Sequence, residues 1–201
     1  MSAKSTSFHG LGIAPKLLAV LEKNKFTVPT PIQEQSIPVA IEGKDIIGIA
    51  QTGTGKTMAF GIPMLQRLAR DGGQGLIVVP TRELAVQVDE SLQKIGRSFG
   101  LKTAVLIGGE AFDRQLRKLK AKAHVIIATP GRLIDHMERR TVRLETTSVF
   151  VMDEADRMLD MGFFDDIAYV AKACPKRRQT LLFSATYPEG VVRLARQFMR
   201  Q

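Results

Sequence analysis

The chain of 201 residues is long enough to form one domain with a sizeable hydrophobic core. Its apolar fraction of 44% and charged fraction of 24% are typical of a globular protein, which excludes disordered, collagen-like and coiled-coil classes. The net charge of +9 favours an anionic partner, although a basic surface that only keeps the protein in solution is equally compatible with it.

The single cysteine, Cys174, excludes an internal disulfide framework, and the polar start MSAKSTS lacks the apolar core of a signal peptide. The apolar runs are much shorter than the roughly 20 residues that a membrane-spanning helix needs. We therefore predict a cytoplasmic protein with no membrane role.

Two helices, over residues 14–24 and 31–42, are predicted to precede the first strand. Continuous apolar runs then alternate with stretches whose apolar residues recur at helical spacing. The predicted strands cover 45–50, 75–79, 103–107, 124–128, 148–152 and 180–184. The predicted helices that follow them cover 56–70, 82–97, 110–121, 131–139, 154–161 and 188–199. This alternation predicts an α/β fold, with a mostly parallel sheet and helices on both of its faces.

No repeat, low-complexity tract or linker divides the chain, so residues 1–201 are expected to form a single domain with 1–43 as a helical extension. Ligands of such sheets bind beyond the carboxyl ends of the strands. The charge is also segregated, because 114–122 and 176–200 are basic whereas 153–166 is acidic. One face is therefore expected to meet phosphate and another to hold a metal ion.

The stretch AQTGTGKT at 50–57 follows a predicted strand and opens a predicted helix. Its glycines let backbone N–H groups and a helix N-terminus point at one anion, while Lys56 adds charge and Thr57 offers a hydroxyl to magnesium. The general phosphate-loop pattern opens with glycine, and Ala50 departs from it. An ordinary turn before a helix is the alternative, which the pattern of four fixed residues disfavours.

The stretch VMDEAD at 151–156 ends another predicted strand. A magnesium–nucleotide site needs one carboxylate for the metal and a second one that orients the attacking water, and Asp153 and Glu154 fill these two places. The same two acids would also suit the first turn of the helix that follows them. The phosphate loop elsewhere in the chain favours the functional interpretation.

With these residues the sequence resembles the DEAD-box RNA helicases, and specifically their first RecA-like domain, over nearly its whole length. The matching stretches occur in the family's order: PTPIQ at 29–33, AQTGTGKT at 50–57, PTRELA at 80–85, GG at 108–109, TPGR at 129–132, DEAD at 153–156 and SAT at 184–186. The resemblance implies a RecA-like P-loop domain that binds ATP and Mg2+.

The resemblance assigns roles to individual residues. Lys56, Asp153 and Glu154 would be catalytic, with Thr57 and Asp153 placing the metal. Gln33 would read adenine, and its amide can both donate to and accept from the N6 amino group and N7 of the base. Phe26 would stack on the base, and Phe8 would be the isolated aromatic residue upstream of the motif. The loop residues implied to bind ATP are Gln51, Thr52, Gly53, Thr54, Gly55, Lys56 and Thr57. Lys25 stands where the family usually has glycine, which puts the shape of that loop in question.

Two further groups follow from the same resemblance. The residues implied to contact the RNA backbone are Thr81, Arg82, Gly109, Thr129 and Arg132, and hydroxyls, glycine amides and arginines suit contacts that do not read sequence. Taken one by one, these residues are better explained as ordinary strand ends and helix caps, and only the familial set favours RNA contacts. Asp156, Ser184 and Thr186 would couple the nucleotide state to strand separation, partly through hydrogen bonds to Asp156.

The function implied is that of the ATP-binding half of an RNA helicase, with RNA and a second RecA-like domain as partners. That second domain is absent from the 201 residues, so this chain is expected to bind nucleotide, to hydrolyse it poorly and to unwind nothing. Two other classes remain open. One is a nucleotide-controlled RNA clamp or protein-binding module, and the other is a P-loop enzyme that acts on DNA or on no nucleic acid.

Overall fold

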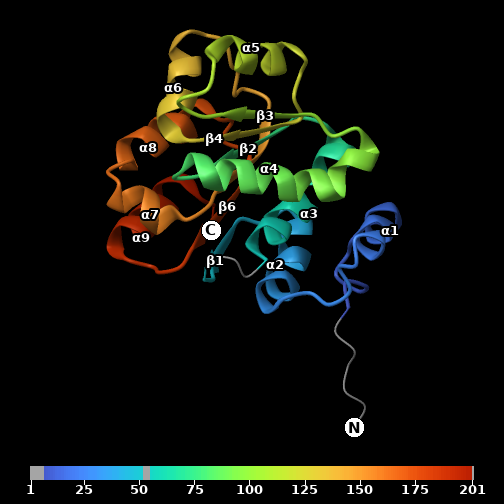
Figure 1. Ribbon diagram of the computed structural model, residues 1–201. Coiled ribbons are helices and arrows are strands. Elements are labelled where there is room, and N and C mark those ends of the chain that lie inside the picture. The colour runs from blue at the N-terminus through green and yellow to red at the C-terminus, as the bar shows by residue number, and fades with distance from the viewer. Residues whose placement is uncertain (1–6, 52–54, 201) are drawn as a thin grey trace.

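The computed structural model describes residues 7–51 and 55–200. Six strands form one sheet in which all neighbouring strands are parallel, in the order β1-β6-β5-β2-β4-β3 (Figure 1). The strands are β1 (Ile46–Ile49), β2 (Gln74–Val78), β3 (Thr103–Leu106), β4 (Val125–Ala128), β5 (Thr147–Met152) and β6 (Gln179–Ser184). The predicted α/β fold is confirmed, and each predicted strand is present to within one or two residues.

The described residues also form α1 (Pro15–Lys23), α2 (Pro31–Ile41), α3 (Lys56–Asp71), α4 (Arg82–Gly96), α5 (Phe112–Lys120), α6 (Pro130–Glu138), α7 (Ala155–Asp160), α8 (Phe164–Ala173), α9 (Glu189–Phe198) and a short 3-10 helix, η1 (Arg97–Phe99). The sequence prediction missed α8. A turn at Gly162, with φ of 85°, separates it from α7, and its N-cap residue Phe163 makes no side-chain hydrogen bond. The usual start signal of a helix is therefore missing there.

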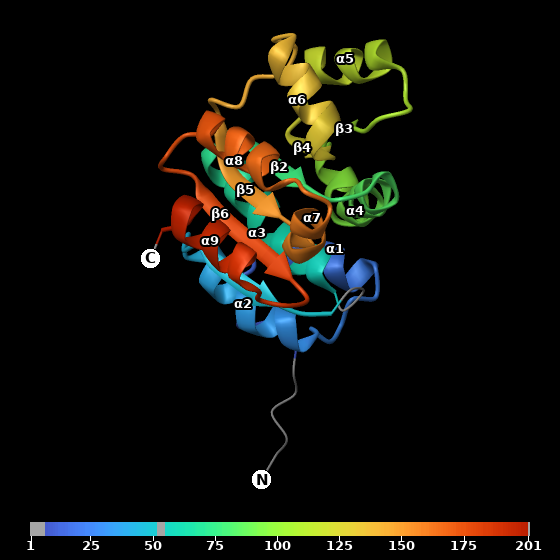
Figure 2. The ribbon, with the colours of Figure 1, turned by 90° about the vertical axis from the view of Figure 1, so that its left-hand side faces the viewer.

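The alternation of side chains along each strand divides the core into two layers. Leu76 and Val78 of β2 pack with α6, α7, α8 and α9, whereas Ile77 of β2 and Val79 just after it pack with α2, α3 and α4. Figure 2 shows α7, α8 and α9 in front of the strands and α3 behind them. Both faces of the sheet are covered, which explains why the strands read as continuous apolar runs.

Helix α1 forms a third layer outside α2, α3 and α4. Its buried residues Leu17 and Leu21 share a core cluster with Ile37, Ile62 and Ile95 of those three helices. The predicted helical extension therefore has two parts, because α2 lies directly on the sheet beside α3 whereas α1 packs only on helices.

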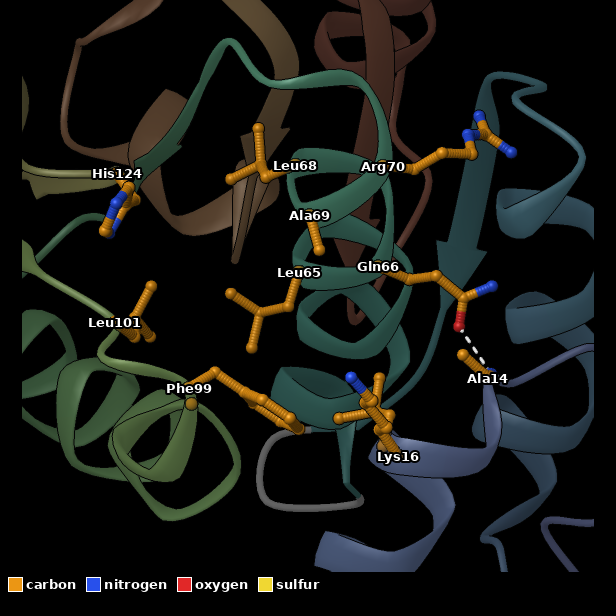
Figure 3. A pocket seen from close by; sticks show the side chains of 12 residues that line it. Ala14, Lys16, Leu65, Gln66, Leu68, Ala69, Arg70, Phe99, Leu101 and His124 are labelled. Atoms are coloured by element: carbon orange, nitrogen blue, oxygen red, sulfur yellow. Dashed lines mark hydrogen bonds between the residues drawn. The ribbon is translucent and has the colours of Figure 1, made fainter.

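Gln66 of α3 holds the segment before α1 in place. Its Oε1 accepts from the backbone N–H of Ala14 at 2.8 Å, and its Nε2 donates to the carbonyl of Gly12 at 3.0 Å. An apolar groove of about 650 Å³ lies between α1, α3 and the residues around η1, and Leu65, Phe99 and Leu101 point into it (Figure 3).

The first and last strands of the sheet are neighbours. β1 pairs with β6 from Ile46 opposite Leu181 to Ile49 opposite Ser184. Just before β1, the carboxylate of Asp45 accepts from the backbone N–H of Thr180 at 2.9 Å and from that of Arg200 at 2.6 Å. No helix in the described part of the chain has the length and apolar character needed to cross a bilayer.

Candidate functional site

The strand order gathers the predicted site residues into two groups at the carboxyl edge of the sheet. The loops after β1, β6 and β5 carry residues 50–57, 184–186 and 153–156, and we call this region the β1 half. The loops after β2, β4 and β3 carry residues 80–82, 129–132 and 108–109, and we call this region the β3 half. The three stretches of the β3 half are consecutive in the sequence and lie between the first and second stretches of the β1 half, and the strand order brings the separated β1-half stretches together.

The loop that leads into α3 ends at Gly55, which has φ of 84°. A Cβ atom at this position would lie 2.5 Å from Nε2 of Gln33 and 2.9 Å from Oγ1 of Thr30, so glycine is required both by the backbone and by the close approach of α2. α3 then begins at Lys56, and its N-terminal amides face the region of the predicted phosphate site. Thr52, Gly53 and Thr54 lie outside the described residues.

Gln33 ties α2 to this loop. Its Oε1 accepts from the backbone N–H of Thr30 at 2.9 Å, which completes a capping box, and its Nε2 donates to the carbonyl of Gly55 at 3.1 Å. A primary amide has two acceptor sites and two donor hydrogens, so one of each remains for a ligand. The assignment of Gln33 as the adenine reader stays a prediction.

The turn after α1 contains Lys25, which stands where the family usually has glycine. Lys25 has φ of 62° and donates to the carbonyl of Glu22, while Phe26 donates to that of Leu21, both at 2.9 Å. This is the Schellman arrangement, in which the residue after the helix cap adopts the left-handed conformation. Lys25 thus adopts a backbone conformation that glycine takes more readily.

The two aromatic residues predicted near adenine occupy different environments. Phe26 is partly buried beside the α1 cluster and keeps some exposed surface, whereas Phe8 is only 5% exposed inside that cluster. The burial of Phe8 anchors the segment before α1. A direct contact between Phe8 and nucleotide stays a prediction.

The centre of the β1 half is an ion pair. Nζ of Lys56 lies 3.1 Å from Oδ1 of Asp153, and the two side chains are 5% and 2% exposed. Burial raises the pKa of Asp153, and the Lys56 ammonium and the backbone N–H of Glu154 oppose this rise. Lys56 comes from the start of α3 and Asp153 from the end of β5, so the fold brings the two predicted catalytic motifs into contact.

Glu154 follows with backbone angles φ of 52° and ψ of 49°. This left-handed conformation costs on the order of 1–3 kcal/mol for a residue other than glycine, and such strain is found more often at functional sites than elsewhere. The side chain is 9% exposed, and its Oε2 lies 3.5 Å from Nη1 of Arg157. The backbone thus places two acids side by side between β5 and α7.

Asp156 connects the β5 loop with the end of β6. Its Oδ2 accepts from the backbone N–H of Thr186 at 3.1 Å and from Oγ1 of Thr186 at 2.8 Å, while its own N–H donates to Oγ of Ser184 at 3.2 Å. Partial burial would raise the pKa of Asp156, but the hydrogen bonds from Thr186 and Ser184 outweigh it and lower the pKa. The predicted contact between these three residues is present.

In the β3 half, Thr81 caps α4 by accepting from the N–H of Leu84 at 3.2 Å. Arg82 is the next residue, and its guanidinium lies over Gly109, where a Cβ atom would collide with Nη1. Gly109 itself has φ of 77°. Two stretches from different strand ends are thus packed together through a glycine that no other residue can replace without strain.

Thr129 precedes α6, and its N–H donates to the carbonyl of Leu106 at 3.1 Å. Three residues later, Nη1 of Arg132 donates to the carbonyl of Glu110 at 3.0 Å and to Oε1 of Gln115 at 3.2 Å. Arg132 therefore links the loop after β4 to the loop after β3. Its Nε also lies 3.8 Å from Oδ2 of Asp135, and the N–H groups of its guanidinium that make no hydrogen bond are the ones left for a ligand.

Sequence reasoning assigned no chemistry to His136, and it did not consider Gln115. His136 is fully buried, lies 2.8 Å from Oε1 of Gln115 through Nε2, and stacks on the ring of Phe112 at 4.1 Å. Burial, with repulsion from Arg132 and Arg139, lowers the pKa of His136 to about 4, although Asp135 opposes the shift. Neither residue carries a motif, so only the three-dimensional contacts identify them as supports of Arg132.

The all-parallel sheet, with its helix-opening loop after β1 and its acidic turn after β5, defines a RecA-like α/β domain. The family model described as DEAD/DEAH box helicase matches residues 30–194. The chain belongs to the DEAD/DEAH box helicase family, as the motifs predicted.

Relatives and solved structures agree with this. The chain is 48% identical over 195 residues to the DEAD-box ATP-dependent RNA helicase CshA of Streptococcus pneumoniae, which covers 96% of this chain and 37% of the relative. CshA of Geobacillus kaustophilus is 48% identical over 198 residues, or 98% of this chain and 42% of the relative. The chain thus spans about two fifths of the length of these relatives.

Among solved structures, a DEAD box protein from the hyperthermophile Methanococcus jannaschii superposes with a TM-score of 0.90 at 37% identity, covering 96% of this chain and 53% of that protein. A hypothetical ATP-dependent RNA helicase from Sulfolobus tokodaii superposes with a TM-score of 0.86 at 35% identity. The match covers 92% of this chain and 55% of that protein. The chain is similar to one part of each of these proteins.

Proposed function

We propose that this chain is the ATP-binding half of a DEAD-box RNA helicase, which couples the binding and hydrolysis of ATP to the separation of RNA duplexes. The observation that carries the proposal is the contact of 3.1 Å between Lys56 and Asp153, which joins the phosphate-loop stretch to the DEAD stretch in a buried site. Ion pairs that are buried so deeply add little stability, so a functional reason for the pair is favoured.

In this proposal the amides at the start of α3 and the Lys56 ammonium bind the β- and γ-phosphates, because both supply positive potential at one point. Glu154 orients the attacking water. Gln33 reads adenine through the acceptor site and the N–H that its contacts with Thr30 and Gly55 leave over. The loop residues Gln51, Thr52, Gly53 and Thr54 complete the cradle.

The donors fit Mg2+, which keeps most of its waters and usually takes one or two carboxylates together with substrate phosphates. The described residues contain no group of three or more His, Cys, Asp or Glu that could enclose a metal ion, and the buried carboxylate of Asp153 with the hydroxyl of Thr57 supplies a partial set. When bound, the metal would neutralise charge on the transferring phosphate. Asp153 and Thr57 are its proposed protein ligands.

RNA is proposed to lie across the β3 half, in contact with Thr81, Arg82, Gly109, Thr129 and Arg132. These groups suit phosphate and sugar, so the contacts would carry no base sequence. The bridge from Asp156 to Ser184 and Thr186 is proposed to transmit the nucleotide state to the RNA. A second RecA-like domain would supply arginines that stabilise charge on the phosphate, a contribution of roughly a thousandfold or more in related nucleotidases.

The test is turnover of magnesium-ATP by the 201-residue chain, with and without single-stranded RNA, alongside a titration with ADP. We expect ADP to bind, turnover to stay near background, and Lys56→Ala to weaken binding. Lys44→Ala is the control and should bind ADP normally, because Lys44 is exposed and lies before the amino end of β1, whereas the phosphate loop follows the carboxyl end. Failure of the wild-type chain to bind ADP would contradict the proposal, and RNA-stimulated turnover that vanishes in Lys56→Ala would contradict the need for a second domain.

A further inference from the structure

A polar cavity of about 410 Å³ lies at the amino end of the sheet, opposite the β1 half and the β3 half. It is enclosed by the end of α3, by residues 145–148 that lead into β5 and by residues 175–178 that lead into β6. Three arginines line it, namely Arg67, Arg177 and Arg178. We call it the basic cavity, and the proposed ATPase and helicase activities do not use it.

Arg178 is a buried cation without an acidic partner. It is 7% exposed, and no carboxylate of the described residues lies within 4.0 Å of its guanidinium. Its nitrogens donate to Oγ1 of Thr180 and to the carbonyls of Pro175 and Phe198, at 2.9–3.2 Å. Those bonds use three of its five N–H groups. Buried charges in proteins are usually paired, so an anion in the cavity would complete this site.

Arg67 shows the same deficit. Its Nη1 donates to Oε1 of Gln179 at 3.2 Å, but its buried Nε has no hydrogen-bond partner. The neighbouring carboxylate of Asp71 is held by Arg70 through two bonds of 2.9 Å. Burial lowers the pKa of Arg67, as do Arg200 and Arg70, although Asp71 opposes the shift. An anion in the cavity would offset the repulsion between Arg67 and the neighbouring arginines, and it could accept a hydrogen bond from Nε of Arg67.

A hydroxyl without a partner lies in the same wall. Oγ of Ser148 is buried and makes no hydrogen bond, and a Cβ atom at Gly73 would come within 2.7 Å of it. Thr147 also lines the cavity. Its hydroxyl makes no hydrogen bond to a nitrogen or oxygen atom, but it interacts with the thiol of Cys174. Arg67, Thr147 and Ser148 all line this cavity. In the described residues outside the β1 half, they are the ones that carry a buried side-chain polar atom without a hydrogen bond to nitrogen or oxygen.

We propose that the basic cavity binds a phosphate group. Arg67 and Arg178 offer N–H groups that can pair with two oxygens of one tetrahedral anion, and Ser148 can donate a third hydrogen bond. The exposed Arg177 adds positive charge at the rim. The carboxylates of Glu145 and Asp71 also line the cavity, and they offset only part of the charge of its three arginines. The phosphate could belong to a small phosphorylated molecule or to the terminal phosphate of an RNA, because the chemistry is the same.

The test uses inorganic phosphate and thermal unfolding of the 201-residue chain carrying Lys56→Ala, so that the phosphate loop contributes little. At constant ionic strength, phosphate at ten times its Kd should raise the Tm by about 3–6 °C over chloride. Adding Ser148→Ala or Arg177→Ala should reduce this rise by half or more, whereas Lys176→Ala, an exposed neighbour outside the cavity, should leave it unchanged.

Ser148→Ala is informative without phosphate as well, because removal of a buried hydroxyl that has no partner should not lower the Tm. The proposal is overturned if phosphate and chloride give equal Tm values in the Lys56→Ala chain, or if the rise with phosphate in that chain is unchanged when Ser148→Ala or Arg177→Ala is added. Neither outcome depends on whether the chain binds ATP or RNA.

The source of the phosphate is found with short RNAs that differ only in a 5′-phosphate or a 5′-hydroxyl. Tighter binding of the 5′-phosphate form that is lost in Arg177→Ala supports the cavity and identifies an RNA end. Equal binding of both RNAs, with inorganic phosphate still sensitive to Arg177→Ala, supports the cavity and identifies a small phosphorylated molecule. Insensitivity of both measurements to Arg177→Ala and Ser148→Ala overturns the proposal.

Discussion

The β1 half and the β3 half use the same architecture, the carboxyl ends of three adjacent parallel strands, but in different ways. The β1 half centres on buried ionisable side chains, with Lys56, Asp153 and Glu154 all under 10% exposed. The β3 half presents exposed or half-exposed groups, and its central contact is a guanidinium packed on a glycine. A site built on a few buried charges should be sensitive to single changes, whereas one built on many surface contacts should lose affinity gradually.

The largest expected effect is therefore in the β1 half. In the protein that includes the second domain, Glu154→Gln should reduce RNA-stimulated ATP turnover by about 10²–10⁴-fold, the usual contribution of a group that orients and deprotonates a nucleophile. ADP affinity should change little, because the amide occupies the same space. Steady-state turnover and an ADP titration measure the two quantities.

Asp160 gives the matched control, because it lies at the exposed end of α7 that follows Glu154. Asp160→Asn should turn over ATP at the wild-type rate. Normal turnover by Glu154→Gln would remove the distinction between the two halves, since the buried acids would then have no special role.

The second prediction concerns His136, a buried group that supports Arg132 of the β3 half through Gln115. The pKa of His136 is about 4 in the folded protein against about 6.5 when unfolded, so the unfolded chain binds a proton that the folded chain excludes. The contribution of neutral His136 to stability is complete well above pH 6.5 and is lost as the pH falls towards 4, by about 3–3.5 kcal/mol in total.

Urea unfolding at several pH values between 7 and 5 measures this loss. His136→Gln should flatten the dependence on pH, whatever it does to the absolute stability. His9, whose side chain is 65% exposed, is the control, and His9→Gln should retain the wild-type slope. Identical slopes for all three proteins would show that His136 titrates freely and that Arg132 lacks a rigid support.

A smaller effect is expected at Gly109. Gly109→Ala should cost about 1–2 kcal/mol of unfolding free energy, because alanine is disfavoured at φ of 77° and its Cβ would displace Arg82. RNA affinity should weaken several-fold with Arg82 displaced, while ADP affinity stays unchanged, which would show that the two halves are separable.

Gly108 is the neighbouring control, because a Cβ there meets no atom within 4 Å and its φ is not positive. Gly108→Ala should keep both affinities. A loss of ADP binding in Gly109→Ala would mean that the halves are mechanically coupled in the isolated domain.

The smallest effect is expected beside the β1 half. Lys25→Gly should raise the unfolding free energy by about 0.5–1 kcal/mol, since glycine avoids the cost of the left-handed conformation but loses some of the gain through its freer unfolded chain. Lys25→Ala should give no gain. Equal stability of the glycine, alanine and wild-type proteins, measured by urea unfolding, would show that the Schellman turn is not strained.

The sequence was sufficient to predict the strands and the placement of their motifs. Apolar runs such as 124–128, which alternate with helical stretches, are typical of strands buried on both faces. Because the strands are parallel, the residues that follow them all lie at the carboxyl edge of the sheet. The proximity of Lys56 and Asp153 could be predicted because both stretches follow strands of one parallel sheet, whereas their catalytic roles stay a prediction.

The remaining features depend on contacts between distant segments. The strand order, which separates the two halves, follows from how the helices pack and leaves no local pattern. The approach of Arg82 to Gly109, and the support of Arg132 by Gln115 and His136, join residues from different loops. Even α8 was missed because packing on the sheet, rather than a cap or a strong start signal, stabilises it.

The pairing of β1 with β6 has a consequence for synthesis of the chain. β1 leaves the ribosome early, but its partner is the last strand, from Gln179 to Ser184. The strand that leads into the phosphate loop therefore stays an unpaired edge while more than a hundred further residues are translated, and such edges are sites of aggregation. Chaperone binding to nascent chains should thus persist until β6 emerges, and the nucleotide site should be among the last parts of the domain to form.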